Sequence, residues 1–276
     1  MPELPEVETI KRGLEETLVG ARVGSLWFSG KPLRLNRAVP RRSLVEASAG
    51  RRVVGLRRRA KYLLVDFEGG GVVVVHLGMT GRLGVSAPEH PRPPHTHVVW
   101  RLEDGRELRY VDARRFGFMT GTSRAREDAL AELAILGLDP LSPELGRLGE
   151  LLASSKRDVK SFLLDQSRVA GLGNIYACEA LYEARIHPGA RAHRLRTGRV
   201  EALGDAIVTV LERGIRNRGT TFSNYVDAYG REGSNQHALQ VYGREGQPCL
   251  RQDGGRIRRT VTQARSTFYC PTCQRP

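Results

Sequence analysis

The sequence predicts an α+β protein: an N-terminal β-sandwich with a helix attached, then a helical region, then a short β-hairpin. Three observations predict this order. Short β-branched runs separated by Gly, Pro and charged turns fill residues 21–120. Leu, Ile and Ala then recur at spacings of three and four. The C-terminal stretch reads as a small β segment that carries Cys249, Cys270 and Cys273.

The predicted elements follow in chain order. The apolar residues of "EVETIKRGLEETLVG" lie at helical spacing, so a helix is expected almost at the N-terminus, with Gly20 as its stop. "YLLVDF", "GVVVVHL", "HVVWRL" and "ELRYVD" are typical of strands, whereas "KRDVKSFLLDQ", "GNIYACEALYEARI" and "GRVEALGDAIVTVLERGIRNRG" are typical of helices. We therefore expect a sandwich domain over 1–125, a linker over 126–145, a helical domain over 146–237 and a hairpin over 238–276.

The charge of the chain restricts its partners. Its 276 residues include 44 Lys and Arg against 30 Asp and Glu, a net charge of +14. Such an excess favours nucleic acid as the partner, although a ribosomal protein or a protein of anionic membrane surfaces has the same overall positive charge. No apolar run approaches the roughly 20 residues that span a bilayer, and the acidic N-terminus does not resemble a signal peptide. A cytoplasmic location is expected.

The second residue is a candidate nucleophile. Removal of Met1, expected before a small residue, would leave Pro2 with a secondary amine at the chain terminus. A terminal amine has a pKa of about 8, so part of it is unprotonated at neutral pH and can attack a carbonyl-like carbon. Glu3 and Glu6 could act as acid or base, and Lys61 could stabilise developing negative charge. The alternative is that the two glutamates only help a helix to start.

Two short strings offer side chains for a DNA duplex. In "DARRFGF", Arg114 and Arg115 would point to opposite faces of a strand unless a turn intervenes. One arginine could then contact a phosphate and the other a gap in the base stack, with Phe116 as a wedge that unstacks the bases. "HLGMTG" supplies a second wedge, Met79. The alternative is a core Phe and Met with surface arginines.

The helical region contains a Gly-rich turn that could bind phosphate. A basic helix ends near Asp165, and Asn174 is expected to cap the next helix, so the amides between them could cradle a phosphate. Lys156 and Lys160 lie four residues apart, on one face of the first helix. Any helix hairpin needs a turn and a cap, so an ordinary hairpin is the alternative.

The C-terminal cysteines predict a metal clip. Paired C-x2-C knuckles would hold a tetrahedral zinc and stabilise a hairpin too small to fold alone. Cys270 and Cys273 form one complete knuckle, whereas the other has Cys249 but Gln252 where a cysteine is expected. Arg265 would lie on the hairpin and point outward, toward DNA.

Seven strings together carry a resemblance to a known family: "PELPEVE", "RRAKYLL", "HLGMTG", "RRFG", "GLGNIYA", "VYGREG" and "RSTFYCPTCQ". They occur in the family's order and approximate spacing over essentially the whole chain. On these strings the chain resembles the formamidopyrimidine-DNA glycosylase (Fpg, MutM) family of base-excision repair enzymes. The sister endonuclease VIII group begins PEGPE, so the first string favours the formamidopyrimidine branch.

The resemblance implies a bifunctional DNA glycosylase and AP lyase that flips an oxidised purine, 8-oxoguanine or a formamidopyrimidine, out of the duplex. It implies that Pro2 attacks the sugar C1′ to form an imine, with Glu3 as acid-base partner and Lys61 assisting elimination. Successive β and δ elimination would break the strand on both sides, and Arg265 would take part in the later step. It further implies a helix-two-turns-helix domain and a loop, around "SNYVDAYGREGSNQ", that closes over the everted base.

The same resemblance assigns the DNA contacts. Met79, Arg114 and Phe116 would fill the hole left by the flipped base, with Arg114 facing the orphaned partner. The backbone contacts implied are His95, Lys156, Lys160 and Asn174. Because Arg114 is assigned to the base gap, the adjacent Arg115 is expected to contact a phosphate.

The departure from the family lies in the hairpin. The family's finger has four cysteines, and Gln252 replaces one of them. A single-residue insertion would let Asp253, or else water, take the fourth position. Either three thiolates and an oxygen bind one zinc ion, or the hairpin folds without metal. No organic cofactor is expected.

Double-stranded DNA with oxidised bases or abasic sites is the implied partner, and we expect a monomer that binds no membrane and acts at the nucleoid in a bacterial cytoplasm. Two alternative functions stay open. One is an endonuclease VIII-like glycosylase for oxidised pyrimidines, which the terminal motif argues against. The other is a catalytically silent damaged-DNA-binding protein of the same fold, which the intact Pro2, Glu3 and Lys61 argue against.

Overall fold

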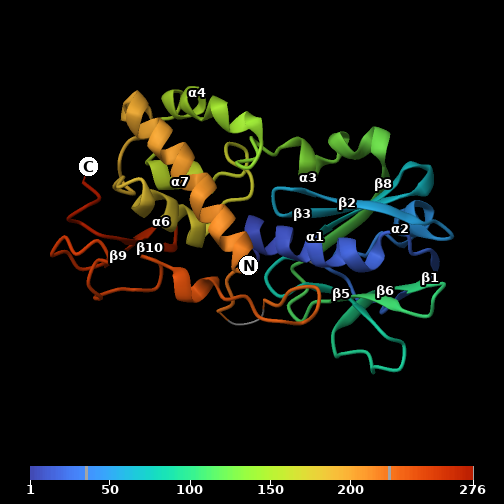
Figure 1. The fold of residues 1–276 in the computed structure, drawn as a ribbon. Coiled ribbons are helices and arrows are strands. Elements are labelled where there is room, and N and C mark those ends of the chain that lie inside the picture. Colours follow the sequence, from blue (N-terminus) through green and yellow to red (C-terminus); the bar gives the residue numbers. More distant parts are fainter. Residues whose placement is uncertain (35–36, 223–224, 276) are drawn as a thin grey trace. The chain divides into compact units, whose positions relative to one another are not determined.

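The structure is a computed structural model that describes residues 1–34, 37–222 and 225–275. Strands fill the N-terminal part, helices the middle, and a two-stranded hairpin follows near the C-terminus (Figure 1). This order confirms the predicted α+β class. Within the described ranges, no helix combines the length and the apolar character that crossing a bilayer requires.

The chain divides into two compact units. Unit 1 consists of Met1–Ala134 and Asn217–Ser234, and unit 2 consists of Ile135–Arg216 and the residues from Asn235 onward. The predicted spans do not coincide with these units. The segment 217–234, expected in the helical domain, packs with the N-terminal strands instead.

Two antiparallel four-stranded sheets form unit 1. The first sheet contains, in spatial order, β1 (Val23–Phe28), β6 (Thr96–Leu102), β7 (Glu107–Val111) and β5 (Arg82–Ser86). The second contains β2 (Val53–Arg59), β3 (Tyr62–Phe67), β4 (Gly71–His76) and β8 (Phe118–Ser123). Trp100 and Tyr110 of the first sheet share one buried core with Leu63 and Val75 of the second. The predicted β-sandwich is confirmed.

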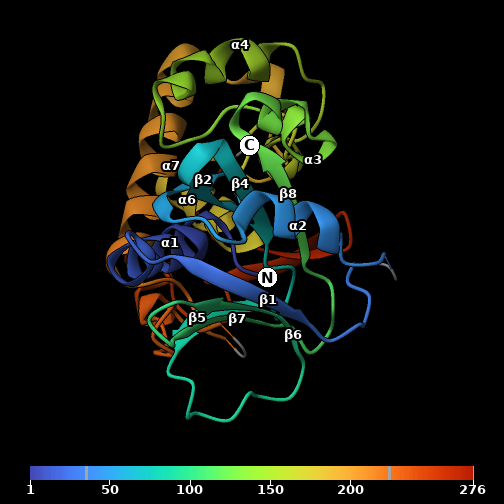
Figure 2. The same cartoon turned by 90° about the vertical axis from the view of Figure 1, so that its right-hand side faces the viewer.

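Two helices cover the edges of this sandwich (Figure 2). α1 (Leu4–Leu18) packs against the edge strands β2 and β5, and α2 (Arg41–Ser48) packs against β8, β4 and β1. The contact of α2 is close because glycines face it: a Cβ at Gly71 would lie 2.0 Å from the Ala47 carbonyl oxygen. A Cβ at Gly121 would lie 1.9 Å from that of Ser43. Covered edges cannot pair with another chain.

Unit 2 contains most of the helices and the hairpin. They are α4 (Leu148–Ala153), α5 (Val159–Leu164), α6 (Asn174–Glu183), α7 (Thr197–Arg216), β9 (Arg258–Thr262) and β10 (Arg265–Tyr269). A single helical turn, α3 (Ala131–Ala134), ends the first segment of unit 1. α5 begins later than its sequence pattern predicts, because the Asp158 side chain caps it by accepting from the Ser161 amide at 2.8 Å. Gly173 rather than Asn174 is the cap residue of α6.

A buried glutamate connects α6 to the segment that leads into the hairpin. Glu179 is 1% exposed and accepts backbone N–H groups of Gln240, Val241 and Tyr242 at 2.9 Å. Burial raises its pKa, while the three amides and Arg213, 3.2 Å away, favour the carboxylate. One carboxylate therefore satisfies three consecutive amides of a stretch that has no strand partner of its own.

Replacing Glu179 with Ala is expected to lower the free energy of unfolding by about 3–5 kcal/mol, because it leaves buried donors and Arg213 without their acceptor. Glu179→Gln keeps one acceptor oxygen and should lose less. Urea unfolding followed by far-UV circular dichroism measures both. A Glu179→Ala chain as stable as the parent would show that these hydrogen bonds contribute nothing to the fold.

Candidate active site and nucleic-acid interface

The N-terminal segment is buried at the start of α1. Pro2 and Glu3 are buried, and the helix begins one residue later, at Leu4. The Glu3 N–H donates to the Glu6 carboxylate at 2.8 Å, which is a helix-capping contact. Glu6 therefore does help the helix to start, as the alternative interpretation proposed. The same contact fixes the backbone next to Pro2.

Four charged side chains act on the chain terminus. Burial lowers the pKa of the terminal amine, which belongs to Met1 in this chain; Glu3 and Glu6 oppose the shift, and Lys61 and Arg114 add to it. Glu3 and Lys61 are themselves only 4% and 5% exposed. Side chains from three separate parts of the sequence thus act where the candidate nucleophile lies, in surroundings that favour an unprotonated amine.

Lys61 is held by a tight turn between β2 and β3. The preceding residue, Ala60, has a φ of 54°, in the left-handed region. On the neighbouring strand, burial lowers the pKa of His76 to about 4, and Lys61 and Arg34 contribute to the shift. His76 is not among the site residues predicted from the sequence, although it opens the "HLGMTG" string. Strand pairing sets His76 opposite Tyr62, the residue after Lys61, and no local pattern reveals that pairing.

Segment 217–234 is fastened to α1 through the same Glu6. Its second carboxylate oxygen accepts the Thr220 N–H at 2.7 Å, and a Cβ at Gly219 would lie 2.9 Å from the Glu6 side chain. Farther along, Tyr229 donates to Glu16, and Ala228 lies against Gly13. The predicted loop over the everted base belongs to this segment, and two of its residues, Ser223 and Asn224, lie outside the described residues.

Two turns of unit 1 present the predicted wedges and arginines. Met79 lies in the turn between β4 and β5, and Phe116 in the turn between β7 and β8; they are 39% and 45% exposed. Arg114 is exposed, and its guanidinium lies 4.6 Å from the Phe116 ring centre. The alternative of a core Met and Phe does not match these exposures. Arg115 has a φ of 56°, so a turn does separate the two arginines.

His95 lies in an exposed position just before β6. It has a φ of 66°, and its carbonyl accepts the Asp112 N–H at 3.0 Å. The hydrogen bond brings His95 beside the turn that carries Arg114. Three segments of unit 1 therefore supply the predicted DNA contacts of this region.

The predicted DNA contacts in unit 2 differ in their exposure to solvent. Lys156 and Arg265 are exposed, whereas Lys160 is fully buried and donates to Thr267 Oγ1 at 2.6 Å and to the Ser266 carbonyl at 3.2 Å. Because α5 begins at Val159, Lys156 does not share a helix face with Lys160. In this structure Lys160 holds the hairpin beside Arg265 rather than a surface phosphate.

Asn174 also contacts the hairpin. Its Nδ2 donates to the Ser266 carbonyl at 2.8 Å, and its Oδ1 is buried with no hydrogen-bond partner among the described residues. The Gly171 amide of the preceding turn donates to Gln166 at 3.0 Å, so this amide is engaged within the protein. The bond to Ser266 uses one of the two Nδ2 hydrogens of Asn174.

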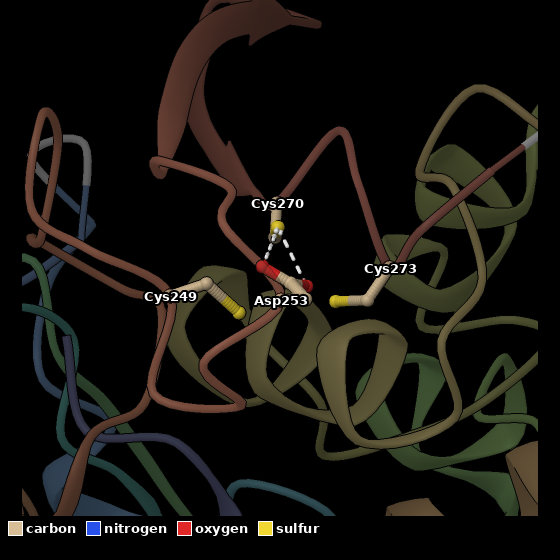
Figure 3. A group of neighbouring side chains, drawn as sticks. All are labelled: Cys249, Asp253, Cys270 and Cys273. Carbon is tan, nitrogen blue, oxygen red and sulfur yellow. Dashed lines mark hydrogen bonds between the residues drawn. The ribbon is translucent and has the colours of Figure 1, made fainter.

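The C-terminal cysteines converge with one aspartate. The ligand atoms of Cys249, Asp253, Cys270 and Cys273 all lie within 4.8 Å of one another, and Figure 3 shows the four side chains pointing toward a common centre. Gln252 is exposed with a φ of 55° and does not join the group. The four residues form a group that could hold a metal ion.

The surroundings of this group suit a tetrahedral divalent cation. The Gly255 N–H donates to Asp253 Oδ1 at 2.8 Å, and Arg251 donates to Cys273 Sγ at 3.4 Å. Tyr182 Oη lies 3.2 Å from Cys249 Sγ. Burial raises the pKa of Cys273 to about 12, so a cation would be needed to keep this thiol ionised. Outer hydrogen bonds of this kind orient metal ligands.

Comparison with known families places both parts of the chain. Residues 1–119 match the model of the formamidopyrimidine-DNA glycosylase N-terminal domain. Residues 136–225 match the model of the formamidopyrimidine-DNA glycosylase H2TH domain. The predicted helix-two-turns-helix region is thereby confirmed.

Full-length relatives give the same result. The formamidopyrimidine-DNA glycosylase of Herpetosiphon aurantiacus is 45% identical, with 99% of this chain and 100% of that protein covered. That of Heliobacterium modesticaldum is 45% identical, with both chains covered completely. Among solved structures, Lactococcus lactis Fpg in complex with a DNA containing N7-benzyl-Fapy-dG superposes with a TM-score of 0.89 at 32% identity, covering 100% of each chain.

Proposed function

The chain belongs to the formamidopyrimidine-DNA glycosylase family, and we propose that its N-terminal Pro2 carries out the family's reaction at the buried site of unit 1. It is a DNA glycosylase with AP lyase activity that acts on oxidised purines in double-stranded DNA. The observation that supports the role of Pro2 is the convergence of Glu3, Glu6, Lys61 and Arg114 on the chain terminus. We place the enzyme in the bacterial cytoplasm, with the DNA.

The proposed reaction begins when the Pro2 nitrogen bonds to the sugar C1′ of the flipped nucleotide. The glycosidic bond breaks, its electron pair leaves with the base, and the proton released from the Pro2 nitrogen balances the charge of the departing base. Glu3, buried beside the terminus, supplies a proton to the sugar ring oxygen as the ring opens and the imine forms. The imine acidifies the C2′–H, so loss of that proton expels the 3′ phosphate, and a second elimination expels the 5′ phosphate. Lys61 stabilises negative charge during these steps.

The two exposed turns are proposed to occupy the gap that the flipped base leaves. Met79 and Phe116 provide apolar wedges, and Arg114 faces the orphaned base. Outer contacts to the DNA backbone are assigned to the predicted residues that lie exposed or half-exposed, namely His95, Arg115, Lys156 and Arg265. Arg265 is also assigned to the later elimination. Lys160 and Asn174 support this interface through their hydrogen bonds to the hairpin.

We further propose that the cysteine group holds one zinc ion. Three thiolates and a carboxylate oxygen are an acceptable tetrahedral set, with Asp253 in the position where the family has a fourth cysteine. Bound there, zinc would cross-link the two ends of the hairpin and fix the strand that begins with Arg265. The ion has a structural role and takes no part in the reaction.

The decisive test is reduction of the imine. The protein is incubated with a duplex containing 8-oxoguanine opposite cytosine, and borohydride is added. A covalent protein–DNA complex is expected. Binding of the DNA without any trapped complex would contradict the glycosylase and favour a silent DNA-binding protein. A duplex with thymine glycol, tested in parallel, should trap far less, and the reverse order would indicate an endonuclease VIII-like specificity.

A further inference from the structure

The two turns that carry the base-gap side chains touch each other through their backbones. The first, residues 77–81, joins β4 to β5, and the second, residues 112–117, joins β7 to β8. Gly78 has a φ of 64°, and a Cβ there would lie 2.5 Å from the Phe116 carbonyl carbon and 2.6 Å from the Gly117 nitrogen. Only a glycine allows this approach, so the positions of Met79 and Phe116 depend on each other.

A single buried carboxylate joins the two turns. Asp112 is completely buried; its Oδ1 accepts the Thr80 hydroxyl at 2.5 Å, and its Oδ2 accepts the Gly117 N–H at 2.8 Å. Thr80 Oγ1 in turn accepts the Arg114 N–H at 3.1 Å. The hydrogen bonds therefore connect Asp112 of the second turn to Thr80 of the first. Thr80 in turn connects back to the backbone of Arg114 in the second turn.

Two further contacts make Asp112 the centre of the region. Tyr110 donates to Oδ2 at 3.1 Å, and because burial and the adjacent carboxylate raise the Tyr110 pKa, the phenol keeps its proton and remains a donor. The Asp112 N–H donates to the His95 carbonyl at 3.0 Å, and its carbonyl contacts a His97 ring nitrogen at 3.0 Å. None of these residues except His95 was identified from the sequence.

We propose that Asp112, acting through Thr80, is a positioning residue for recognition of the base opposite the lesion. It holds Met79, Arg114 and Phe116 as one rigid group, so that Arg114 meets the orphaned base at a fixed distance. Charged hydrogen bonds inside a buried site are strong enough to fix such geometry. The inference rests on the proposed function of these three side chains in the base gap.

Thr80→Val tests the proposal because it keeps the side-chain shape and removes only the hydroxyl that bonds to Asp112 and to the Arg114 N–H. The measurement is equilibrium binding to duplexes that carry a tetrahydrofuran abasic analogue opposite cytosine or opposite adenine, so no chemistry is needed. The preference of the parent chain for one base is expected to fall by about tenfold, within the range of one good base contact. Affinity for undamaged duplex, which depends on phosphate contacts, should not change.

Two control variants accompany Thr80→Val. Thr80→Ser keeps the hydroxyl and should restore the preference, and Thr17→Val, which loses only hydrogen bonds within α1, should leave it intact. An unchanged preference in Thr80→Val, a uniform loss of affinity for all duplexes, or a parent chain without any preference would each overturn the proposal. Loss of imine trapping by the parent chain, with the binding preference intact, would instead contradict the proposed reaction and leave this inference standing.

Discussion

A chain in which the Pro2 nitrogen remains in a peptide bond is expected to form no borohydride-trapped complex. The lone pair of an amide nitrogen is delocalised into the carbonyl group, so it cannot attack C1′. Inserting one alanine between Met1 and Pro2 produces such a chain while keeping a small residue after the initiator. Trapping on 8-oxoguanine DNA should fall by at least about 100-fold, since the nucleophile is lost.

Mass spectrometry of the parent protein completes this experiment, because the active preparation must lack Met1. Both chains should bind tetrahydrofuran-containing duplex with the same affinity, which separates the loss of chemistry from a loss of binding. Full trapping by the alanine-insertion chain would reject Pro2 as the nucleophile. Full trapping by a parent chain that retains Met1 would reject it as well.

Zinc removal is expected to have the second large effect. Protein purified without added metal should contain about one zinc per chain, and a strong chelator should abolish incision of 8-oxoguanine duplex. Zinc contributes about 10–16 kcal/mol to the folding of finger peptides, so a hairpin that depends on it would lose its structure. Arg265 begins β10 and would lose its fixed place with it.

Substitutions at two adjacent residues provide a matched pair that tests which residue is the fourth zinc ligand. Losing a hydrogen-bonding partner of a metal ligand lowers metal affinity by up to about 100-fold. Asp253→Ala removes a ligand itself, so it should lower zinc affinity by more than that. Gln252→Gly suits the positive φ at that position and should retain the metal. Zinc measured by mass spectrometry distinguishes them. Retention by the Asp253 variant and loss by the Gln252 variant would reverse the assignment, and a metal-free parent chain would support a hairpin that folds alone.

The sandwich could be predicted from the sequence because its strands are β-branched and its turns rich in Gly and Pro. The helix ends were less predictable. The sequence suggested that Lys156 and Lys160 share a helix face, but the Asp158 cap begins α5 after Lys156. Burial of Lys160 could not be foreseen, because its acceptors, Ser266 and Thr267, lie more than a hundred residues away in the chain.

The candidate site shows the same limit. Pro2 could be selected because its chemistry is local, and Met79 and Phe116 because they stand in recognisable strings. Asp112 could not be selected, because its importance lies in contacts with Thr80 and His95 that only the fold creates. At the finger, the sequence left Asp253 and water as alternatives. Gln252 has a φ of 55°, and the Asp253 carboxylate that follows it lies among the thiols (Figure 3).

The discontinuous composition of unit 1 has a practical consequence for anyone who divides this protein. The chain passes from one unit to the other after Ala134, after Arg216 and after Ser234. A single cut after Ala134 would therefore yield no independent halves, because the second fragment still carries the piece that completes the first. That piece is fastened to α1 by Glu6 and by the Tyr229–Glu16 contact. The two fragments would behave as a split protein. The second fragment would supply segment 217–234, which binds Glu6, and Glu6 is the residue that caps the N-terminal helix of the first fragment.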